Sequence, residues 1–265
     1  MGSFDSDAPF DRVAILRGLV PGQRWWCALG ERESMGTTAA GEDIWRGNDL
    51  TPAPTSHTAI PVPPDAGEQM SVVSESANDT IAGSGAQKVT IEYLDAAGDE
   101  QTTTVDMNGT TPVALTPSDV RFVNEFYVSQ IGGGAGAVAA GHIKIHQTAD
   151  AGLVYSMIAL GGNFALVPHR MVPRAHEFCL LEWSGTEAQN KRCVLRIRAD
   201  ATPAGVRQQG VFLFRGTQYL RQTTSGQINL GSRIPALSIV KVTGWAIVVG
   251  AEASVNWCGV LISLE

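Results

Sequence analysis

Residues 88–107, KVTIEYLDAAGDEQTTTVDM, alternate apolar and polar side chains on both sides of a short turn. Val89, Ile91 and Tyr93 follow one another at every second position. This period of two residues places the apolar side chains on one face of a β-strand. The glycine-containing turn at 95–99 then sends the chain back as a second strand. The stretch therefore predicts an antiparallel hairpin with one buried and one solvated face.

The same alternation recurs along most of the chain, which constrains the fold class. The further predicted strands lie at residues 120–131, 142–146, 178–183, 192–198, 236–250 and 253–264. A chain of 265 residues with 44% apolar and 17% charged residues can bury a sizeable core. Many short strands joined by Gly, Pro and Asn turns predict an all-β protein, a β-sandwich or jelly-roll with two similar halves.

The first 55 residues differ from the rest. Leu16 and Leu19 have helix-like spacing ahead of a Pro-Gly stop, and the following segment holds tryptophans without a clear period. Large aromatic side chains need a surface to bury against, either the chain's own body or a neighbour. The predicted organisation is an N-terminal arm with a short helix (1–55), a first half (56–149) and a second half (150–265). Deleting the arm is expected to abolish assembly and to leave a folded body. The predicted partner-contact residues are Trp25, Trp26, Trp45, Leu16 and Leu19.

Charge is divided unevenly along the chain. Residues 1–150 hold 8 Lys/Arg against 20 Asp/Glu, and residues 151–265 hold 11 against 6. Such a division suits contacts between the halves or between neighbouring subunits. We expect no nucleic-acid partner, because the arginines are spread over several strands without an aromatic platform. We expect no membrane partner either, because no stretch approaches the roughly 20 apolar residues that cross a bilayer.

Cysteine and histidine spacing gives no metal or redox signature. Four cysteines without a CxxC pair predict reduced, buried thiols. A hairpin symmetric about Thr186 would place Cys179 opposite Cys193. His142 and His146 lie on a predicted strand, where four residues span about 13 Å, too far to share one ion.

The remaining polar motifs fit turn chemistry better than catalysis. Asp79, Asp95, Asp99 and Glu100 lack the ligand spacing of an EF-hand loop, although calcium at a turn stays open. The chain has no G-x-S-x-G motif and no phosphate-binding loop. We therefore predict no catalytic residue, no bound metal and no cofactor, and a protein that is not an enzyme.

Residues 60–113 resemble a module of virion structural proteins from tailed bacteriophages. The module has a Ser-rich strand followed by "ANDT-AG-GA", an "I-YLD--G-E" hairpin and "NGTTPV". The matching positions are Ala77–Thr80, Ala82–Gly83, Gly85–Ala86, Ile91–Asp95 with Gly98 and Glu100, and Asn108–Val113. Residues 171–199 are similar to the second half of the same proteins, with Arg174-Ala175 in place of small turn residues. The resemblance covers residues 57–200 and implies a β-rich, non-enzymatic and oligomeric subunit.

The resulting interpretation is a virion protein that assembles in the host cytoplasm as a capsid decoration, cement or head-fibre subunit. Its expected partners are its own copies, as a homotrimer, and the major capsid protein or other virion proteins. A tail or collar component is the next alternative. A receptor- or glycan-binding module, using aromatics such as Tyr155, Phe164 or Tyr219, and a depolymerising enzyme are the rivals from other classes.

Overall fold

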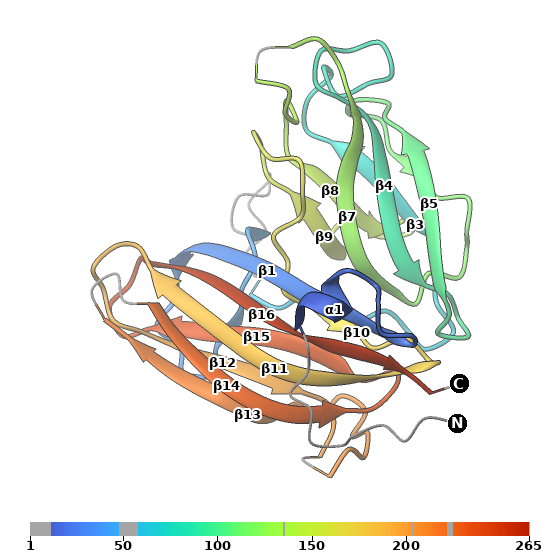
Figure 1. The fold of residues 1–265 in the computed structure, drawn as a ribbon. Coiled ribbons are helices and arrows are strands. Elements are labelled where there is room, and N and C mark those ends of the chain that lie inside the picture. Colours follow the sequence, from blue (N-terminus) through green and yellow to red (C-terminus); the bar gives the residue numbers. More distant parts are fainter. Residues whose placement is uncertain (1–11, 48–57, 135, 203, 222–224, 265) are drawn as a thin grey trace.

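The computed structural model describes residues 12–47, 58–134, 136–202, 204–221 and 225–264. These residues form sixteen strands and one short helix, α1 (Arg12–Leu16). Every ladder between named strands is antiparallel, so the all-β prediction is confirmed. The strands build two bodies, each with two sheets packed around its own core (Figure 1).

The larger body comprises residues 12–46 and 168–264 and packs two sheets face to face. Its four-stranded sheet runs in the order β1 (Gln23–Met35), β16 (Ala251–Ser263), β11 (His176–Glu187) and β14 (Ser225–Ile234). Its five-stranded sheet runs in the order β10 (Arg170–Met171), β15 (Ile239–Ala246), β12 (Cys193–Ala199) and β13 (Leu213–Leu220), with β2 (Glu42–Asp43) beside β15. Trp26, Trp183 and Trp257 from one sheet meet Leu195 and Val242 from the other in the core.

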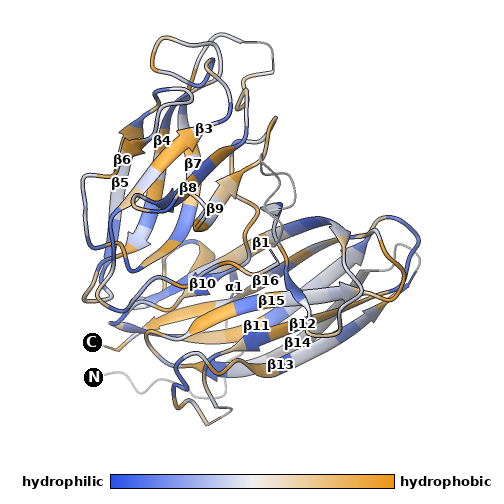
Figure 2. Ribbon diagram, turned by 180° about the vertical axis from the view of Figure 1, so that it is seen from behind, coloured by the Kyte–Doolittle hydropathy of each residue, from blue (hydrophilic) through white to orange (hydrophobic). Residues whose placement is uncertain are grey.

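The smaller body comprises residues 60–167 and is also built from two sheets. One runs in the order β6 (Val113–Ala114), β3 (Met70–Ser74), β8 (Ile143–Gln147) and β9 (Val154–Ile158). The other runs in the order β5 (Glu100–Asp106), β4 (Ala86–Leu94) and β7 (Phe122–Ile131). Val72 and Ile145 of the first sheet share a core with Ile91 and Phe126 of the second. Hydrophobic and hydrophilic residues are interleaved along these strands (Figure 2).

The larger body is discontinuous in sequence, because the smaller body is inserted between β2 and β10. Strand β1 pairs with β16 from Gln23 opposite Ile262 to Met35 opposite Ala251. The prediction of an irregular N-terminal arm is therefore wrong for residues 23–35, which form a strand within the four-stranded sheet. Residues 1–11 and 48–57 of the predicted arm and its surroundings lie outside the described residues. Strand β9 pairs with β8, so the smaller body continues past the predicted boundary at 149/150. Deleting residues 1–55 would remove an entire strand of the larger body.

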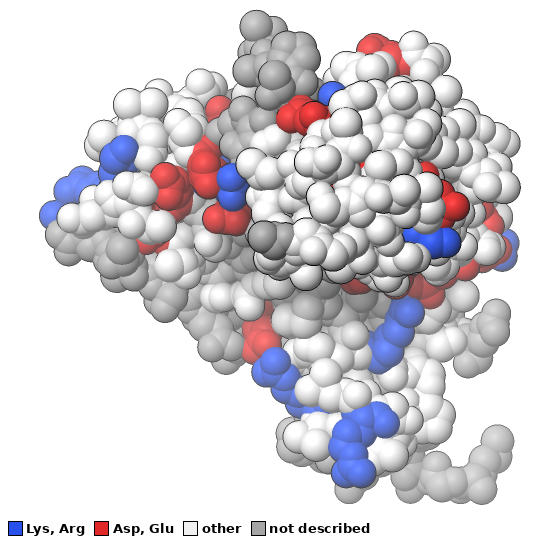
Figure 3. Space-filling view, turned by 90° about the horizontal axis from the view of Figure 1, so that it is seen from above, with Lys and Arg blue, Asp and Glu red and all other residues white. Residues whose placement is uncertain are grey.

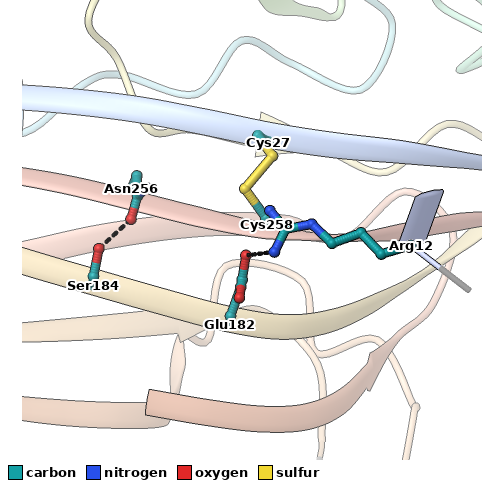
Figure 4. The surroundings of a disulfide bond; sticks show 6 residues. All are labelled: Arg12, Cys27, Glu182, Ser184, Asn256 and Cys258. Atoms are coloured by element: carbon teal, nitrogen blue, oxygen red, sulfur yellow. Dashed lines mark hydrogen bonds and ion pairs between the residues drawn. A yellow bond between two sulfur atoms is a disulfide. The ribbon is translucent and has the colours of Figure 1, made fainter. Parts of the chain in front are cut away.

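The hairpins predicted around Thr186 and around residues 250–253 are not formed, because in each case the chain passes from one sheet to the other. Strands β11 and β12 lie in different sheets, and so do β15 and β16. Cys179 and Cys193 are therefore not opposite one another, and both are free. The structure instead joins Cys27 to Cys258 in a disulfide across β1 and β16, with Cα atoms 4.2 Å apart (Figure 4). The expectation of reduced thiols is thus wrong for this pair, whose 231-residue separation gives no local signal.

The hairpin at residues 88–107 is confirmed. Strands β4 and β5 pair without interruption from Lys88 opposite Asp106 to Leu94 opposite Glu100. Asp95 closes the turn, because its Oδ1 accepts hydrogen bonds from the backbone N–H groups of Ala97 and Asp99 at 3.0 Å. These bonds hold the pKa of Asp95 below its ordinary value against the opposing effect of burial.

Asp79 organises the Gly-rich loops at one end of the smaller body and is fully buried. Its Oδ1 accepts hydrogen bonds from the backbone N–H groups of Ala86 (2.7 Å) and Ala140 (2.9 Å). Its Oδ2 accepts from the Ser74 hydroxyl (2.6 Å) and the Gly141 N–H (2.9 Å). One carboxylate thus joins the residues on either side of its own loop to the distant loop at 140–141, which makes it a structural residue rather than a ligand-binding one.

We predict that Asp79→Asn lowers the free energy of unfolding by about 3 kcal/mol, because an amide can accept at only one of the two positions and leaves buried donors unpaired. Urea unfolding followed by tryptophan fluorescence measures the change. The matched control is Asp106→Asn on β5, which is 62% exposed and should change stability by no more than about 0.5 kcal/mol. Equal effects of the two substitutions would contradict the structural role of Asp79.

Candidate functional site

The candidate site is a cleft of about 450 Å³ between the two bodies. Strand β1 of the larger body forms one wall, and strands β4, β5 and β7 of the smaller body form the other. Its lining residues are Arg24, Trp25, Trp26, Glu92, Tyr93, Glu100, Gln101, Thr102, Asn124 and Glu125. The cleft is predominantly polar, with one half-buried indole ring, that of Trp25, at the β1 wall.

Contacts between the bodies fix the shape of this cleft. The Asn124 side chain donates to the Met171 carbonyl (3.1 Å) and accepts from the Met171 N–H (2.9 Å), so β7 is joined to β10. A small apolar cluster lies between the bodies and contains Leu94, Phe122, Met171 and Ile239. Both the hydrogen bonds and the cluster are buried, so the cleft walls are held in one arrangement.

The tip of the β4–β5 hairpin also rests on the larger body. Arg174 donates from Nε to Oδ1 and from Nη2 to Oδ2 of the Asp99 carboxylate, at 3.0 and 2.8 Å. Arg24 forms an ion pair with Glu100. Gly98 has a φ of +87°, and a Cβ there would come within 2.4 Å of the Leu237 side chain. The turn that the sequence predicts as a simple reversal is therefore also a contact between the two bodies.

Two carboxylates lie side by side in the cleft. Glu92 on β4 is directly opposite Glu125 on β7, an arrangement in which like charges repel. Burial raises the pKa of Glu92, and the neighbouring charge of Glu125 raises it further. The buried guanidinium of Arg170 lies 3.6 Å from Glu125 and partly offsets the repulsion. Burial in turn lowers the pKa of Arg170 to about 10.

This arrangement offers hydrogen-bond acceptors and one aromatic face to a polar ligand. The acceptors are the carboxylates of Glu92 and Glu125 and the amide oxygens of Gln101 and Asn124, with Asn124 already engaged by Met171. Across the described ranges, no group of three or more His, Cys, Asp or Glu side chains is placed to hold a metal ion. The cleft can therefore recognise hydroxyl or amine donors by hydrogen bonding, with Trp25 as the apolar contact.

The predicted partner-contact residues are placed in different environments. Trp26 is buried in the core of the larger body, and Trp45 is fully buried in the core of the smaller body. These two tryptophans therefore bury against the chain's own bodies. Trp25 is half-buried at the cleft wall, beneath the guanidinium of Arg12 at 4.5 Å. Leu16 and Leu19 are 56% and 60% exposed, and their contact with a partner stays a prediction.

The histidines and aromatics singled out in the sequence do not converge on the cleft. His146 lies on β8, with a pKa lowered by burial, and His142 precedes that strand and accepts from the Leu160 N–H. Tyr155 is buried and donates to Glu68, which removes it as an exposed recognition residue. Tyr219, in contrast, is exposed on β13.

The cleft residues Glu92 and Glu125 are not distinguishable in the sequence from the polar residues of other alternating strands. Asn124 instead shares the buried phase of β7 with Phe122 and Phe126, and a polar residue in an apolar phase is a sequence signal. Only the insertion of one body into the other brings β1 to face them. Two glutamates directly opposite each other on neighbouring strands would indicate a functional site, but this pairing can be recognised only once the register of β4 and β7 is known.

Comparison with known proteins identifies no relative by sequence. No family model matches the chain, and none of the curated proteins matches it. Among solved structures, a structure of infectious bursal disease virus Gx strain has a TM-score of 0.24 and 8% identity over 97% of this chain and 77% of that one. A mutant VP2 protein of the same virus, in T=1 particles, has a TM-score of 0.22 and 9% identity over 98% and 76% of the two chains.

TM-scores of this size do not indicate a shared fold. No helix in the described part of the chain has the length and apolar character of a membrane-spanning segment.

We predict that Glu92→Gln raises the midpoint of thermal unfolding at pH 7. The pKa of Glu92 is raised above its ordinary value of 4.5 on folding, so its ionised form destabilises the fold above the raised pKa. Below pH 4.5 the side chain is protonated in both states and the gain disappears. Calorimetry from acid to neutral pH tests this, with Asp106→Asn as the exposed control. A gain that persists at low pH would contradict an electrostatic origin.

Proposed function

We propose that this chain is a non-enzymatic structural subunit of a tailed-bacteriophage virion, an oligomeric capsid decoration, cement or head-fibre protein attached through its N-terminal segment. The observation that carries the attachment is helix α1. Ile15 is buried where α1 contacts β1, while Val13 and Leu16 of the helix and Leu19, three residues beyond its end, are 62%, 56% and 60% exposed. Exposed apolar side chains within one short segment are typical of a surface that binds a partner.

The residues that carry the sequence resemblance support a structural role. Asp79 of the "ANDT" motif binds the backbone of Ala86 in the following "GA", so that motif builds a loop. Gly98 and Glu100 of the "I-YLD--G-E" motif contact the larger body. Contacts of this kind hold the loop and the two bodies in a fixed shape, which is a property that a particle subunit needs.

The attachment is tested with phage particles purified from the host that carries the gene. Immunogold labelling with antibody to this chain is expected to mark the particles, and added wild-type protein is expected to co-sediment with particles that lack it. Leu16→Ser/Leu19→Ser should reduce co-sedimentation at least about tenfold, because partner contact requires the apolar surface.

The control for this experiment is Val206→Ser/Val211→Ser, which changes two equally exposed apolar residues of another loop. It should bind particles as the wild type does. Unlabelled particles would overturn the virion assignment. Labelled particles with unchanged binding of the Leu16/Leu19 variant would leave that assignment standing and overturn the role of α1.

A second candidate function, binding of a glycan receptor, is favoured by the cleft between the bodies. An indole ring beside carboxylates and an amide can stack on a sugar and accept hydrogen bonds from its hydroxyl groups. A glycan array probed with the purified chain is then expected to give a signal that Trp25→Ala abolishes and Tyr219→Ser, outside the cleft, retains. A signal that survives Trp25→Ala would exclude the cleft.

A further inference from the structure

The outer face of the five-stranded sheet gathers aromatic and basic side chains from three neighbouring strands. Directly opposed residues of antiparallel strands point to the same face. Tyr219, Val194 and Trp245 form one such row across β13, β12 and β15, and Phe214, Arg198 and Lys241 form another. Arg196 lies between the two rows on β12. These residues, termed the Arg–aromatic face below, are Val194, Arg196, Arg198, Phe214, Tyr219, Lys241 and Trp245.

Cations and rings alternate across the Arg–aromatic face. The guanidinium of Arg196 lies 4.4 Å from the ring of Trp245 and 4.5 Å from that of Phe214. The guanidinium of Arg198 lies 4.8 Å from the same Phe214 ring. Stacking of this kind holds the arginines flat against the sheet and keeps their positions fixed.

The two stacked arginines lack a carboxylate partner within the described ranges. Neither Arg196 nor Arg198 forms an ion pair there, whereas Lys241 is paired with Asp43 at 3.0 Å. The Nε atoms of both arginines are buried without a hydrogen-bond partner among the described residues. Two like charges two residues apart on one strand repel each other. Asp43, the carboxylate whose charge acts on Arg198, is already paired with Lys241, so the face keeps a net positive charge that an acidic partner would offset.

The composition of this face is that of a protein interface rather than of an ordinary solvated sheet. Tyr, Trp and Arg are the residues most enriched among those that dominate binding energy, and Tyr219 and Phe214 leave 75% and 54% of their surface in water. Arg196 already stacks on the Phe214 and Trp245 rings, which leaves fewer free ring faces on which bases could stack. A folded, acidic protein surface fits the face better than a nucleic acid does.

A second copy of this chain offers an acidic protein surface of that kind, because the charges are divided unevenly between the two bodies. The smaller body, residues 60–167, carries 3 Lys/Arg against 12 Asp/Glu. The two segments of the larger body, 12–46 and 168–264, carry 16 Lys/Arg against 9 Asp/Glu. In the view of Figure 3, Lys and Arg atoms lie at the left and over the lower part of the molecule, and others lie beside Asp and Glu atoms near the centre and the right margin.

We propose that the Arg–aromatic face binds the acidic smaller body of a second copy of this chain. The proposal rests on the proposed function in one respect, since it supplies the contact through which an oligomeric virion subunit would assemble. The contact joins two different surfaces and is therefore heterologous. Repetition of such a contact closes into a ring if the rotation permits and otherwise produces an open chain.

The first test is the association state of the purified full chain in solution. Sedimentation velocity is expected to show an oligomer at about 0.1 M NaCl that dissociates at about 1 M, because charged contacts are screened. Arg196→Glu/Arg198→Glu should weaken association at least about tenfold, since it places negative charge against an acidic surface. Tyr219→Ser, which removes an exposed ring that the fold does not need, should weaken association in the same direction.

The matched control is Arg12→Glu/Arg233→Glu, the same charge change on the four-stranded sheet and its covering helix, which should leave association unchanged. Zero-length carbodiimide cross-linking of a mixture of ¹⁴N and ¹⁵N chains that carry Arg196→Lys, which keeps the positive charge and adds a reactive amine to the face, is expected to join position 196 of one copy to carboxylates of residues 60–167 of another. Lys241 is not used for this readout, because it is paired with Asp43 of its own chain. A wild type that stays monomeric, variants that associate like the wild type, or an amine at position 196 that cross-links only within its own chain would each overturn the proposal. Capture by single-stranded DNA in place of self-association would overturn it too. Antibody labelling of particles does not depend on any of these results, so failure of this proposal can be distinguished from failure of the virion assignment.

Discussion

The pairing of β1 with β16 is the constraint on which the rest of the structure depends. It joins the described start of the chain to its end and closes the larger body around the inserted smaller body. The Cys27–Cys258 disulfide fixes this pairing, and cross-linking residues so far apart removes a large share of the unfolded chain's freedom. The same strand supplies Trp26 to the core and Arg24 and Trp25 to the cleft, so closure and candidate site depend on one element.

Insertion of one body into another also explains why the two act as one unit. The chain crosses between them twice, and the β4–β5 tip adds Arg174–Asp99 and Arg24–Glu100 to those crossings. Asn124 satisfies both polar groups of the Met171 backbone, which would otherwise be buried without partners. Contacts of this kind oppose the relative motion expected of two domains joined by a flexible linker.

Local pairing could be predicted from the sequence, whereas the pairing of distant strands could not. The alternation around Ile91 and the turn at Asp95 define their hairpin, because period and turn chemistry act over a few residues. The connection after Glu187 carries the same signals, yet it passes between sheets, since a turn does not specify which partner a strand takes. The cleft and the Arg–aromatic face were unpredictable for the same reason: arginines that are scattered in sequence become neighbours only through the registers of β12, β13 and β15.

The two exposed surfaces with the strongest claim to partners lie on opposite sides of the larger body. Helix α1 covers the outer side of the four-stranded sheet, where Arg12 reaches Glu182 (Figure 4). The Arg–aromatic face is the outer side of the five-stranded sheet, and the core lies between the two sheets. Neither surface obstructs the other, so the proposed apolar contact with a particle and the proposed charged contact with a neighbouring copy are compatible. The apolar contact tolerates salt and the charged one is screened by it, so the two contacts are separable by ionic strength alone.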